Sequence, residues 1–370
     1  MSAAFNSAAK MKKTYIGAES IISPLGENVG ENFAALLENR SGITRVLNAG
    51  FNGEAVYLGK IINNIYTFQR LIAESIKLVL GQIDPAIISS DKTILIVSST
   101  KGALDEDILD QFGKSIVGLR EQFGLINQPI VVSNACISGV LAINAAGNFI
   151  NAGVYEHAIV IGCDLISNFV LYGFQSLFAI SDKPCEPFNA GRNGITMGEG
   201  CAAVVVSNSE SIFKEVPFTL LPGTTANDAN HISGPSRTGE GLYRSVKKTM
   251  EINKLTPDEF DFISAHGTAT VFNDEMESIA FDRLGLSHIP LNSFKGYFGH
   301  TLGAAGVMET VASMQMMRQN VLIKSLGFDE SGTSKKLNII KKNTTAELNT
   351  ILKTASGFGG GNASLVIAKR

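Results

Sequence analysis

The chain has 370 residues, of which 45% are hydrophobic and 18% charged, and its formal net charge at pH 7 is -3. This length can bury one large or two medium cores, and the near-neutral charge argues against nucleic-acid or membrane partners. No apolar run reaches the roughly 18 residues that span a bilayer. The four cysteines show neither CxxC nor Cys/His ligand spacing, so we expect a cytoplasmic protein without a metal site.

The first half of the chain alternates strand and helix patterns after an N-terminal extension, predicted over residues 1–12. Residues 1–10 are predicted to be a leader or a frayed extension, with the native start at Met11. Helices are predicted where apolar residues recur at helical spacing, over 28–38 and 65–83. Strands are predicted over 13–22, 93–97, 129–132, 158–161 and 201–206.

Cys136 lies where one of these strands passes into a helix. The apolar run 129–132 is interrupted by Ser133 and Asn134, and helical spacing of apolar residues begins after Cys136. A thiol in the first turn of a buried helix faces unpaired N–H groups and the positive end of the dipole, which would lower its pKa. Cys136 is therefore a candidate nucleophile, and a small buried hydrophobe is the alternative interpretation.

The second half repeats this order. Helices are predicted over 243–252 and from His300 to about Met317, and strands over 218–221, 260–264, 289–293, 351–355 and 363–368. Strands that alternate with helices indicate parallel α/β halves with right-handed crossovers. We place the first half at 13–208 and the second at 209–370.

Three pairs of landmarks support the repeat, because they recur at nearly one offset. Thr100 and His266 are 166 residues apart, Cys136 and His300 are 164 apart, and Gly198 and Gly359 are 161 apart. Two similar halves would bring Cys136 and His300 to equivalent helix starts that face each other. His266 would lie at the carboxyl end of a strand, where open α/β sheets collect their chemistry.

His266 and His300 stand in glycine-threonine contexts at the ends of predicted buried strands. The other three histidines, His157, His231 and His288, lie beside polar residues and are predicted to have surface or capping roles. One cysteine and two histidines suit carbon–carbon bond formation on thioesters: the cysteine accepts an acyl group, and histidine N–H groups stabilise the enolate that decarboxylation of a malonyl unit leaves. This chemistry needs neutral imidazoles that donate through Nε2, and no metal, flavin or nicotinamide cofactor.

Two charged residues are predicted to support the histidines. Glu309 is flanked by apolar residues, so it should be buried and should have a partner. Lys295 lies five residues before His300, and a simple surface lysine is the alternative interpretation. Together they would orient the histidines electrostatically.

From Lys13 onward the chain resembles the type II β-ketoacyl-acyl-carrier-protein synthases of the Cys-His-His elongating class, in the thiolase superfamily. Six ordered motifs carry the resemblance, at residues 15–43, 135–139, 187–200, 265–274, 295–306 and 357–363. Each neighbouring class differs at one residue. A degradative thiolase would have a second cysteine near Gly357, an initiating Cys-His-Asn synthase would have Asn at position 300, and a chain-length factor would lack Cys136.

The resemblance implies a thiolase-like α/β fold, in which duplicated βαβ halves form five αβαβα layers. It implies that Cys136 accepts the acyl group, that His266 and His300 drive decarboxylation and condensation, and that Lys295 and Glu309 form the supporting ion pair. The N–H groups of Cys136 and Phe358 would form the oxyanion hole, with Phe358 also a gating aromatic. The implied substrate-binding positions are Thr268 and Thr270, on the pantetheine arm, with Thr100 and Gly359.

The resemblance also implies that no cofactor resides in the protein, since substrates arrive on the phosphopantetheine of an acyl carrier protein. It implies a homodimer, or a heterodimer with a related ketosynthase-like subunit. Several positions depart from the family pattern, and Thr100-Lys101 is polar where aliphatic side chains are usual; the other departures are Asn134, Ile137, Asn189, Asn193, Ala269 and Gly361. We therefore expect a specialised type II polyketide or aryl-polyene pathway. Housekeeping fatty-acid elongation and a weakly active partner subunit are the alternatives.

Overall fold

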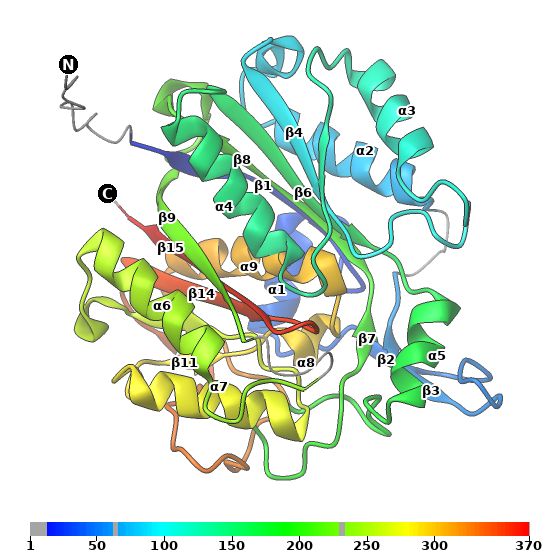
Figure 1. Ribbon diagram of the computed structural model, residues 1–370, viewed down its shortest axis with the longest axis vertical. Helices are drawn as coiled ribbons and strands as arrows, with labels where there is room; N and C mark the ends of the chain where they lie inside the picture. Colours follow the sequence, from blue (N-terminus) through cyan, green and yellow to red (C-terminus); the bar gives the residue numbers. More distant parts are fainter. Residues whose placement is uncertain (1–12, 62–65, 229–233, 370) are drawn as a thin grey trace, which may run out of the picture.

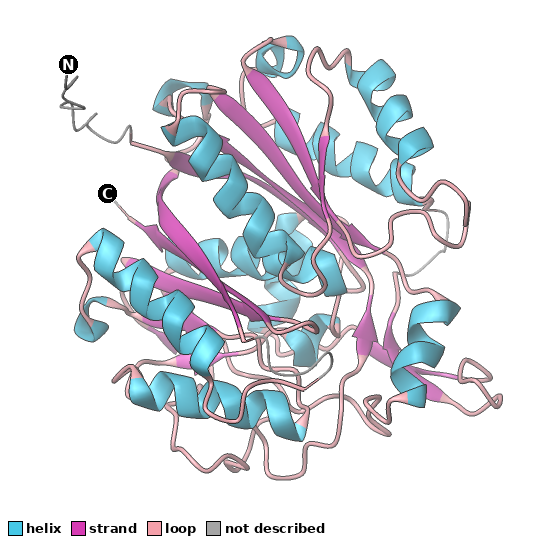
Figure 2. Cartoon of the chain, viewed as in Figure 1, coloured by secondary structure: helices cyan, strands magenta, loops and turns pink. Residues whose placement is uncertain are grey.

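The centre of the molecule is a ten-stranded sheet, in the order β11-β10-β14-β15-β9-β1-β8-β6-β4-β5. The computed structural model describes residues 13–61, 66–228 and 234–369, so the predicted extension 1–12 and His231 lie outside the described residues. Figures 1 and 2 show the sheet running diagonally through the molecule. Its strands are β1 (Tyr15–Ile22), β4 (Thr93–Ser98), β5 (Ile130–Val132), β6 (His157–Asp164), β8 (Gly200–Ser207), β9 (Phe218–Asn227), β10 (Phe262–Ser264), β11 (Leu291–Asn292), β14 (Thr350–Ser356) and β15 (Gly361–Ala368).

The sheet consists of two halves with the same topology. In the first half, β5, β4 and β6 are parallel, and β8 and β1 follow in antiparallel pairing. In the second half, β11, β10 and β14 are parallel, and β15 and β9 follow in antiparallel pairing. The halves join through a short antiparallel contact of β1 with β9. The repeat predicted from the sequence is therefore present in strand order and direction, and the exact boundary at residue 208 stays a prediction.

Helices form three layers around the two half-sheets. Between the halves lie α4 (Ser138–Asn151) and α9 (Ala305–Gln319), and both helices pack on strands of both halves. The outer face of the first half carries α2 (Phe68–Leu80) and α3 (Gly113–Phe123), and that of the second carries α6 (Glu240–Asn253) and α7 (Val271–Arg283). A helix with strands on two sides is apolar nearly all round, as predicted for α4. The five-layered arrangement is confirmed.

The shorter elements lie at the edges of this framework. The helix α1 begins after Asn28, whose side chain accepts a hydrogen bond from the N–H of Glu31 and so satisfies one free donor of the first turn. A small sheet has the order β2-β3-β7, and β12 pairs with β13. These elements are α1 (Val29–Leu37), β2 (Ile43–Val46), β3 (Val56–Gly59), α5 (Asn168–Ser176), β7 (Met197–Gly198), α8 (Lys295–Phe298), β12 (Val321–Leu322) and β13 (Thr344–Thr345).

Two predicted elements differ from the structure in ways that bear on the site. The strand β5 is half-buried, because it is the outermost strand of the sheet and pairs only with β4. The helix predicted to start at His300 is interrupted: a short 3-10 helix η4 (Leu302–Ala304) intervenes and α9 begins at Ala305. His300 therefore lies on a loop and not in the first turn of a helix.

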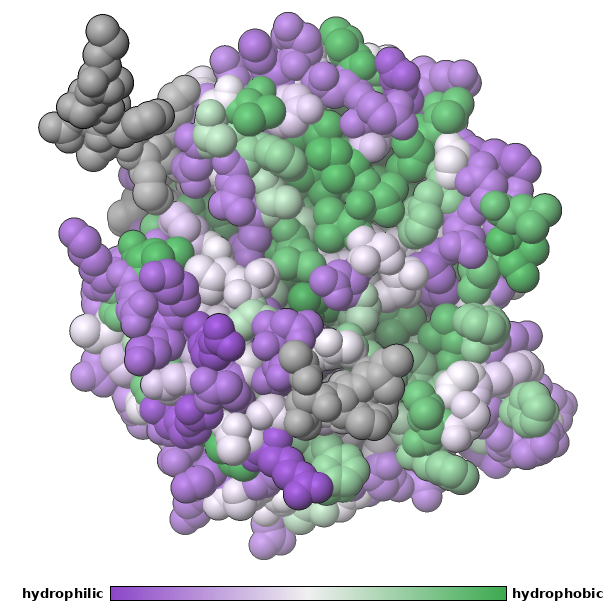
Figure 3. All heavy atoms as spheres, viewed as in Figure 1, coloured by the Kyte–Doolittle hydropathy of each residue, from purple (hydrophilic) through white to green (hydrophobic). Residues whose placement is uncertain are grey.

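The surface in Figure 3 shows hydrophobic side chains gathered over α4 and β5, in the upper part of that view. Half-buried apolar side chains from these two elements are Ile130, Val132, Leu141, Ala145 and Phe149. Among the described residues, no helix is both long enough and apolar enough to cross a bilayer.

Candidate active site

Three predicted residues converge at the centre of the molecule, where the two halves meet. The Sγ atom of Cys136 lies 3.1 Å from Nε2 of His300. The ring centroids of His266 and His300 are 5.3 Å apart, with the ring planes at 81°. All three side chains are buried. Cys136 is thus brought next to two histidines that lie 130 and 164 positions later in the chain, as the repeat predicted.

A tight turn holds Cys136 immediately before α4. Ala135 has a left-handed backbone (φ 44°), which a non-glycine residue adopts at a cost that the surrounding turn must offset. The Ser138 hydroxyl fixes this turn, because it donates to the carbonyl of Ala135 and accepts from the N–H of Asn134, both at 2.7 Å. Cys136 precedes the N-cap Ile137, so it lies just outside the helix and not in its first turn.

The predicted lowering of the cysteine pKa is wrong, because burial outweighs the effects that favour the thiolate. Burial raises the pKa of the Cys136 thiol to about 11, against the opposing effects of the Lys295 charge and of the N–H groups of Phe358 and Cys136. The thiol is therefore protonated at rest. Its reactivity must therefore come from groups of the site that stabilise the charge developing when the thiol attacks a bound thioester.

Both histidines are held neutral. Burial, followed by the positive charge of Lys295, lowers the pKa of His266 and of His300 well below the usual value of 6.5. Nδ1 of His300 accepts from the N–H of Leu302 at 3.3 Å, and Nδ1 of His266 lies 3.3 Å from the Lys295 ammonium, which has only protons to donate. In both rings this leaves the proton on Nε2, the arrangement that the sequence analysis required.

The predicted ion pair is present. Lys295 is fully buried, so the surface-lysine interpretation is wrong. Its ammonium donates to Oε1 of Glu309 at 2.8 Å and to the carbonyl oxygen of His266 at 2.5 Å. Because α8 carries Lys295 and α9 carries Glu309, the pair connects both elements to the strand end that presents His266.

Three buried charged residues of this region were missed by the sequence analysis: Asp164, Glu277 and Lys353. Asp164, at the end of β6, accepts from the N–H of Gly303 at 2.7 Å and so holds the turn that follows His300. Glu277, on α7, accepts from the N–H of His266 at 2.8 Å. Burial raises the pKa of Glu277 to about 7. The sequence contains no clear signal for this burial, because α7 lacks an apolar stripe and buries polar residues beside Met276 and Phe281.

The cluster opens into a cavity of about 400 Å³, and Thr268, Thr270 and Phe358 line it together with the cysteine and the histidines. The hydroxyls of Thr268 and Thr270 are 2.9 Å apart. Phe358 is partly exposed, and its ring lies 5.3 Å from that of Phe174 on α5. The structure thus places an aromatic side chain and two hydroxyls in the same cavity as Cys136, and their roles in gating and in pantetheine binding stay predictions.

Two predicted substrate-binding residues lie outside this lining. The Thr100 hydroxyl donates to Oδ1 of Asp164 at 3.1 Å. Because the resemblance assigns Thr100 to a pocket across a dimer interface, its role stays a prediction. Gly359 has a left-handed backbone (φ 84°) in the turn directly after Phe358, and it shapes that turn.

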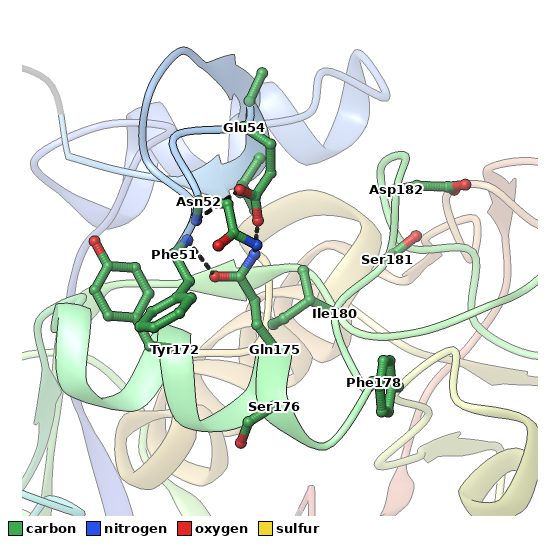
Figure 4. A pocket seen from close by; sticks show the side chains of 12 residues that line it. Phe51, Asn52, Glu54, Tyr172, Gln175, Ser176, Phe178, Ile180, Ser181 and Asp182 are labelled. Carbon is green, nitrogen blue, oxygen red and sulfur yellow. Dashed lines mark hydrogen bonds between the residues drawn. The ribbon is translucent and has the colours of Figure 1, made fainter.

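A second hollow lies beside the cavity, on the far side of Phe178. Its volume is about 600 Å³, and Figure 4 shows its lining, with Phe51 against Tyr172 and with Gln175 bonded to Glu54. It contains none of the predicted site residues and no cysteine or histidine. A third hollow, between Ser287 and Thr344, is larger still at about 1100 Å³, and no cysteine or histidine lines it. The chemistry therefore belongs to the smallest of the three.

The remaining histidines differ in burial. His157, predicted to have a surface or capping role, is buried between strands, and its Nδ1 lies 2.8 Å from the Ser207 hydroxyl on the neighbouring strand. His288 is exposed beside Asp258, in agreement with the prediction.

Cys136, His266 and His300 also hold their sulfur and nitrogen atoms within 4.8 Å of one another. Such a set could bind one soft divalent ion. The expectation of no metal therefore stays a prediction.

Comparison with known proteins agrees with this geometry. Residues 119–211 match the family model "Beta-ketoacyl synthase, N-terminal domain" and residues 220–329 match "Beta-ketoacyl synthase, C-terminal domain". The 3-oxoacyl-[acyl-carrier-protein] synthase 2 of Rhizobium meliloti is 33% identical over 272 residues, covering 68% of this chain and 63% of that protein. The polyketide biosynthesis malonyl-ACP decarboxylase PksF of Bacillus subtilis is 28% identical over 259 residues, covering 67% of this chain and 62% of that protein. The chain thus spans less than two thirds of the length of these relatives.

Among solved structures, the ketosynthase ApeO of Xenorhabdus doucetiae, in complex with its chain length factor ApeC, superimposes with a TM-score of 0.87. The match covers 99% of this chain and 100% of that chain at 24% identity. The fold is therefore the thiolase-like fold of ketosynthases. Together the two family models cover more than half of the sequence, and the chain belongs to the beta-ketoacyl synthase family.

Proposed function

We propose that the protein is a 3-oxoacyl-[acyl-carrier-protein] synthase, which joins an acyl group on Cys136 to a malonyl unit with loss of CO2. The observation that carries this proposal is the contact of Cys136 Sγ with His300 Nε2 at 3.1 Å, beside the neutral ring of His266. A nucleophile next to two neutral donors fits both acyl transfer and enolate stabilisation.

In the first step the Cys136 sulfur attacks the carbonyl carbon of an acyl thioester on the carrier. The N–H groups of Cys136 and Phe358, which point at the sulfur, would stabilise the oxyanion that forms. The tetrahedral intermediate collapses, the carrier thiol leaves with the proton from Cys136, and the acyl group remains on the sulfur.

In the second step a malonyl-carrier occupies the same cavity. The Nε2 protons of His266 and His300 hydrogen-bond its thioester carbonyl oxygen, so the carbon–carbon bond to the carboxylate breaks, CO2 leaves and an enolate remains. The enolate carbon then attacks the acyl carbonyl on Cys136. The Cys136 thiolate leaves and takes a proton from solvent, and the carrier holds a 3-oxoacyl chain that is two carbons longer.

We assign the enzyme to a specialised type II polyketide or aryl-polyene pathway. The support is the set of departures around the site, including Ile137 beside the nucleophile and the polar pair Thr100-Lys101. Housekeeping fatty-acid elongation is the alternative, and the name of the relative from Rhizobium meliloti, 3-oxoacyl-[acyl-carrier-protein] synthase 2, is compatible with either pathway. A decarboxylase without condensation is a second candidate, because that activity is named for PksF.

The partners in this proposal are an acyl carrier protein and a second ketosynthase-like subunit, identical or related. The half-buried apolar side chains over α4 and the edge strand β5 support a subunit contact there. A weakly active partner subunit of a heterodimer remains the alternative role for this chain.

Intact-protein mass spectrometry tests the proposal. The protein is incubated with acyl-carrier proteins that carry saturated or polyunsaturated chains, and is then chased with malonyl-carrier protein; Cys136→Ala is run in parallel. We expect loading on the wild type only, followed by a 3-oxo product, with polyunsaturated chains preferred. Preference for saturated chains would support fatty-acid elongation, CO2 release without extension would support a decarboxylase, and no loading at all would support a partner subunit.

A further inference from the structure

Lys353 lies in an unusual place for a lysine. It is in the middle of β14 and is fully buried. Its neighbours at alternate positions, Ile351 and Ala355, belong to the core between the two half-sheets, whereas Leu352 packs on the outer side with α6 and α7. The strand pattern would place an apolar side chain at position 353, and a lysine there costs free energy unless it is paired.

The Lys353 ammonium donates to the carbonyl oxygen of its neighbour Thr354 at 2.8 Å, and its other partners are parts of the active site. Its ammonium donates to Oε2 of Glu309 at 2.5 Å, and Lys295 takes the other oxygen, Oε1. Glu309 therefore bridges two lysines. The Lys353 ammonium also lies 3.3 Å and 3.4 Å from the carbonyl oxygens of Ser264 and Ala265, while Lys295 holds the carbonyl of His266. Three successive carbonyls at the end of β10 are thus held by two ammonium groups.

The charges around Lys353 do not balance within this cluster. Lys295 on α8 and Lys353 on β14 share the single carboxylate of Glu309 on α9, which leaves one positive charge behind the two histidines. The carboxyl group of Glu277, on α7, faces the same cluster, but because its pKa is raised to about 7 it is mostly protonated below that pH and leaves the positive charge uncompensated there. The Lys353 charge, after burial and Lys295, also lowers the pKa of both imidazoles. Burial lowers the pKa of Lys353 itself, and Glu309 opposes that change.

We propose that Lys353 is a positioning residue of the condensing site, which shares Glu309 with Lys295, holds the strand end before His266 and supplies the second positive charge behind the two histidines. This inference rests on the proposed function. It assigns Lys353 no contact with substrate: its effect passes through Glu309 and the backbone of residues 264–266.

The consequence is a dependence on pH. Without Lys353, Glu309 and Lys295 form a neutral pair, so the imidazoles accept protons more readily. A protonated imidazole no longer has the neutral form that the decarboxylation step uses. We therefore expect the decarboxylation rate to begin its fall toward acid pH at a higher pH than in the wild type. Below the protonation midpoint of a histidine, each unit by which that midpoint rises should lower the rate about tenfold.

The experiment compares Lys353→Met with Lys353→Arg, which keeps the charge, and with Leu352→Ala, which weakens the same strand from its other face. Lys353→Gln serves as a second charge-free variant that retains a donor for the two carbonyls, should the methionine variant not fold. Two quantities are measured on the full chain: the protonation midpoints of His266 and His300 by NMR of histidine-labelled protein, and the rate of malonyl-carrier decarboxylation between pH 5 and 8.

We expect the protonation midpoints of both histidines to rise in Lys353→Met or Lys353→Gln. The pH at which the decarboxylation rate falls on the acid side should rise with them. Lys353→Arg and Leu352→Ala should keep the wild-type midpoints, even if they melt at lower temperature. Unchanged midpoints in the charge-free variants, or equal changes in the Leu352→Ala control, would overturn the inference. The NMR midpoints can be measured whether or not the protein turns over substrate. Failure of the inference about Lys353 is therefore distinguishable from failure of the proposed function, which would show as absence of decarboxylation by the wild type.

Discussion

Cys136 is subject to opposing influences. Burial raises the pKa of its thiol, while Lys295 and two N–H groups act against that rise. The N–H groups that face the sulfur are also those that would receive the oxyanion of a bound thioester. The site is therefore built to stabilise charge that develops during the reaction, and not to maintain a thiolate at rest.

The two histidines should separate acylation from decarboxylation. His266→Ala or His300→Ala removes an Nε2 donor from the enolate but leaves the Cys136 sulfur and both N–H groups in place. We expect acyl loading to persist, and CO2 release from malonyl-carrier to slow by roughly 10²–10⁴. Mass spectrometry follows the loading, and a carbon-14 carboxyl label follows the CO2. Wild-type CO2 release in either variant would remove that histidine from the mechanism.

Glu277 should give stability a defined dependence on pH. Its pKa is raised from 4.5 to about 7, first by burial and then by Asp274, so folding favours the protonated form. The stability that it contributes is full below about pH 4.5 and is lost as the pH rises through about 7. Relative to Glu277→Gln, the wild-type free energy of unfolding should fall by about 1.4 kcal/mol per pH unit between these limits. Urea unfolding at pH 5.5, 6.5 and 8 measures the difference, and a constant difference would contradict the assignment.

Among individual residues, the reacting ones could be predicted from the sequence, but not all of those that support them. Cys136, His266 and His300 stand in glycine-rich motifs at strand ends, which are visible in a linear sequence. Asp164 and Lys353 are charged residues whose partners are far away in the chain, and their burial becomes evident only when those partners are adjacent. Glu277 has its partners only 10 and 11 residues away, at Gly267 and His266, but it lies on a helix that the sequence analysis did not predict. The cysteine pKa was predicted in the wrong direction because helix position was considered without the desolvation of a closed site.

Among the elements, the crossing of α4 and α9 fixes the distance between the two halves of the site. The helices touch at Gly139 and Gly306: a Cβ atom added to Gly306 would lie 2.5 Å from the backbone nitrogen of Val140. Backbone cannot move aside as a flexible side chain can, so the helices would have to separate. Because Cys136 lies just before α4 and Glu309 lies on α9, that separation would disturb the active site.

We predict that Gly306→Ala destabilises the fold by about 1–3 kcal/mol and slows acylation of Cys136. Gly173→Ala on α5 is the matched control, since an added Cβ atom there meets nothing within 4 Å. Thermal unfolding and the rate of acyl loading are compared for both variants. Equal unfolding temperatures and equal loading rates in the two variants would show that the close approach of α4 and α9 affects neither stability nor acylation.

Elements with strong periodicity were predicted well, and those that bury polar side chains were not. The helices α1 and α2, and the buried strands β4, β6 and β8, lie within a few residues of their predicted bounds. The helix α7 was missed, because it buries Asp274, Glu277 and Ser278 beside apolar residues and so lacks a clear apolar stripe. The break before α9 was missed because the apolar run continues through η4.

For the whole molecule, the free edge of the ten-stranded sheet suggests how two subunits would meet. Ile130 lies on the edge strand β5 and is one of the half-buried apolar residues of that strand and of α4. We predict a dimer by native mass spectrometry and a shift toward monomer in Ile130→Lys, because a buried charge at the contact would be unpaired. Val117→Lys, at an exposed apolar residue of α3, is the control. A monomeric wild type, or equal masses for all three proteins, would contradict a contact at this edge.

The most direct test of the central claim is a single-turnover chase on the acylated protein. Wild type loaded on Cys136 is mixed with malonyl-carrier protein, and the masses of the protein and of the carrier are followed in time. We predict that the acyl mass leaves Cys136 at the rate at which CO2 and a carrier-bound 3-oxoacyl chain, two carbons longer, are formed. Loss of the acyl group without the extended product, or extension that persists in Cys136→Ala, would contradict it.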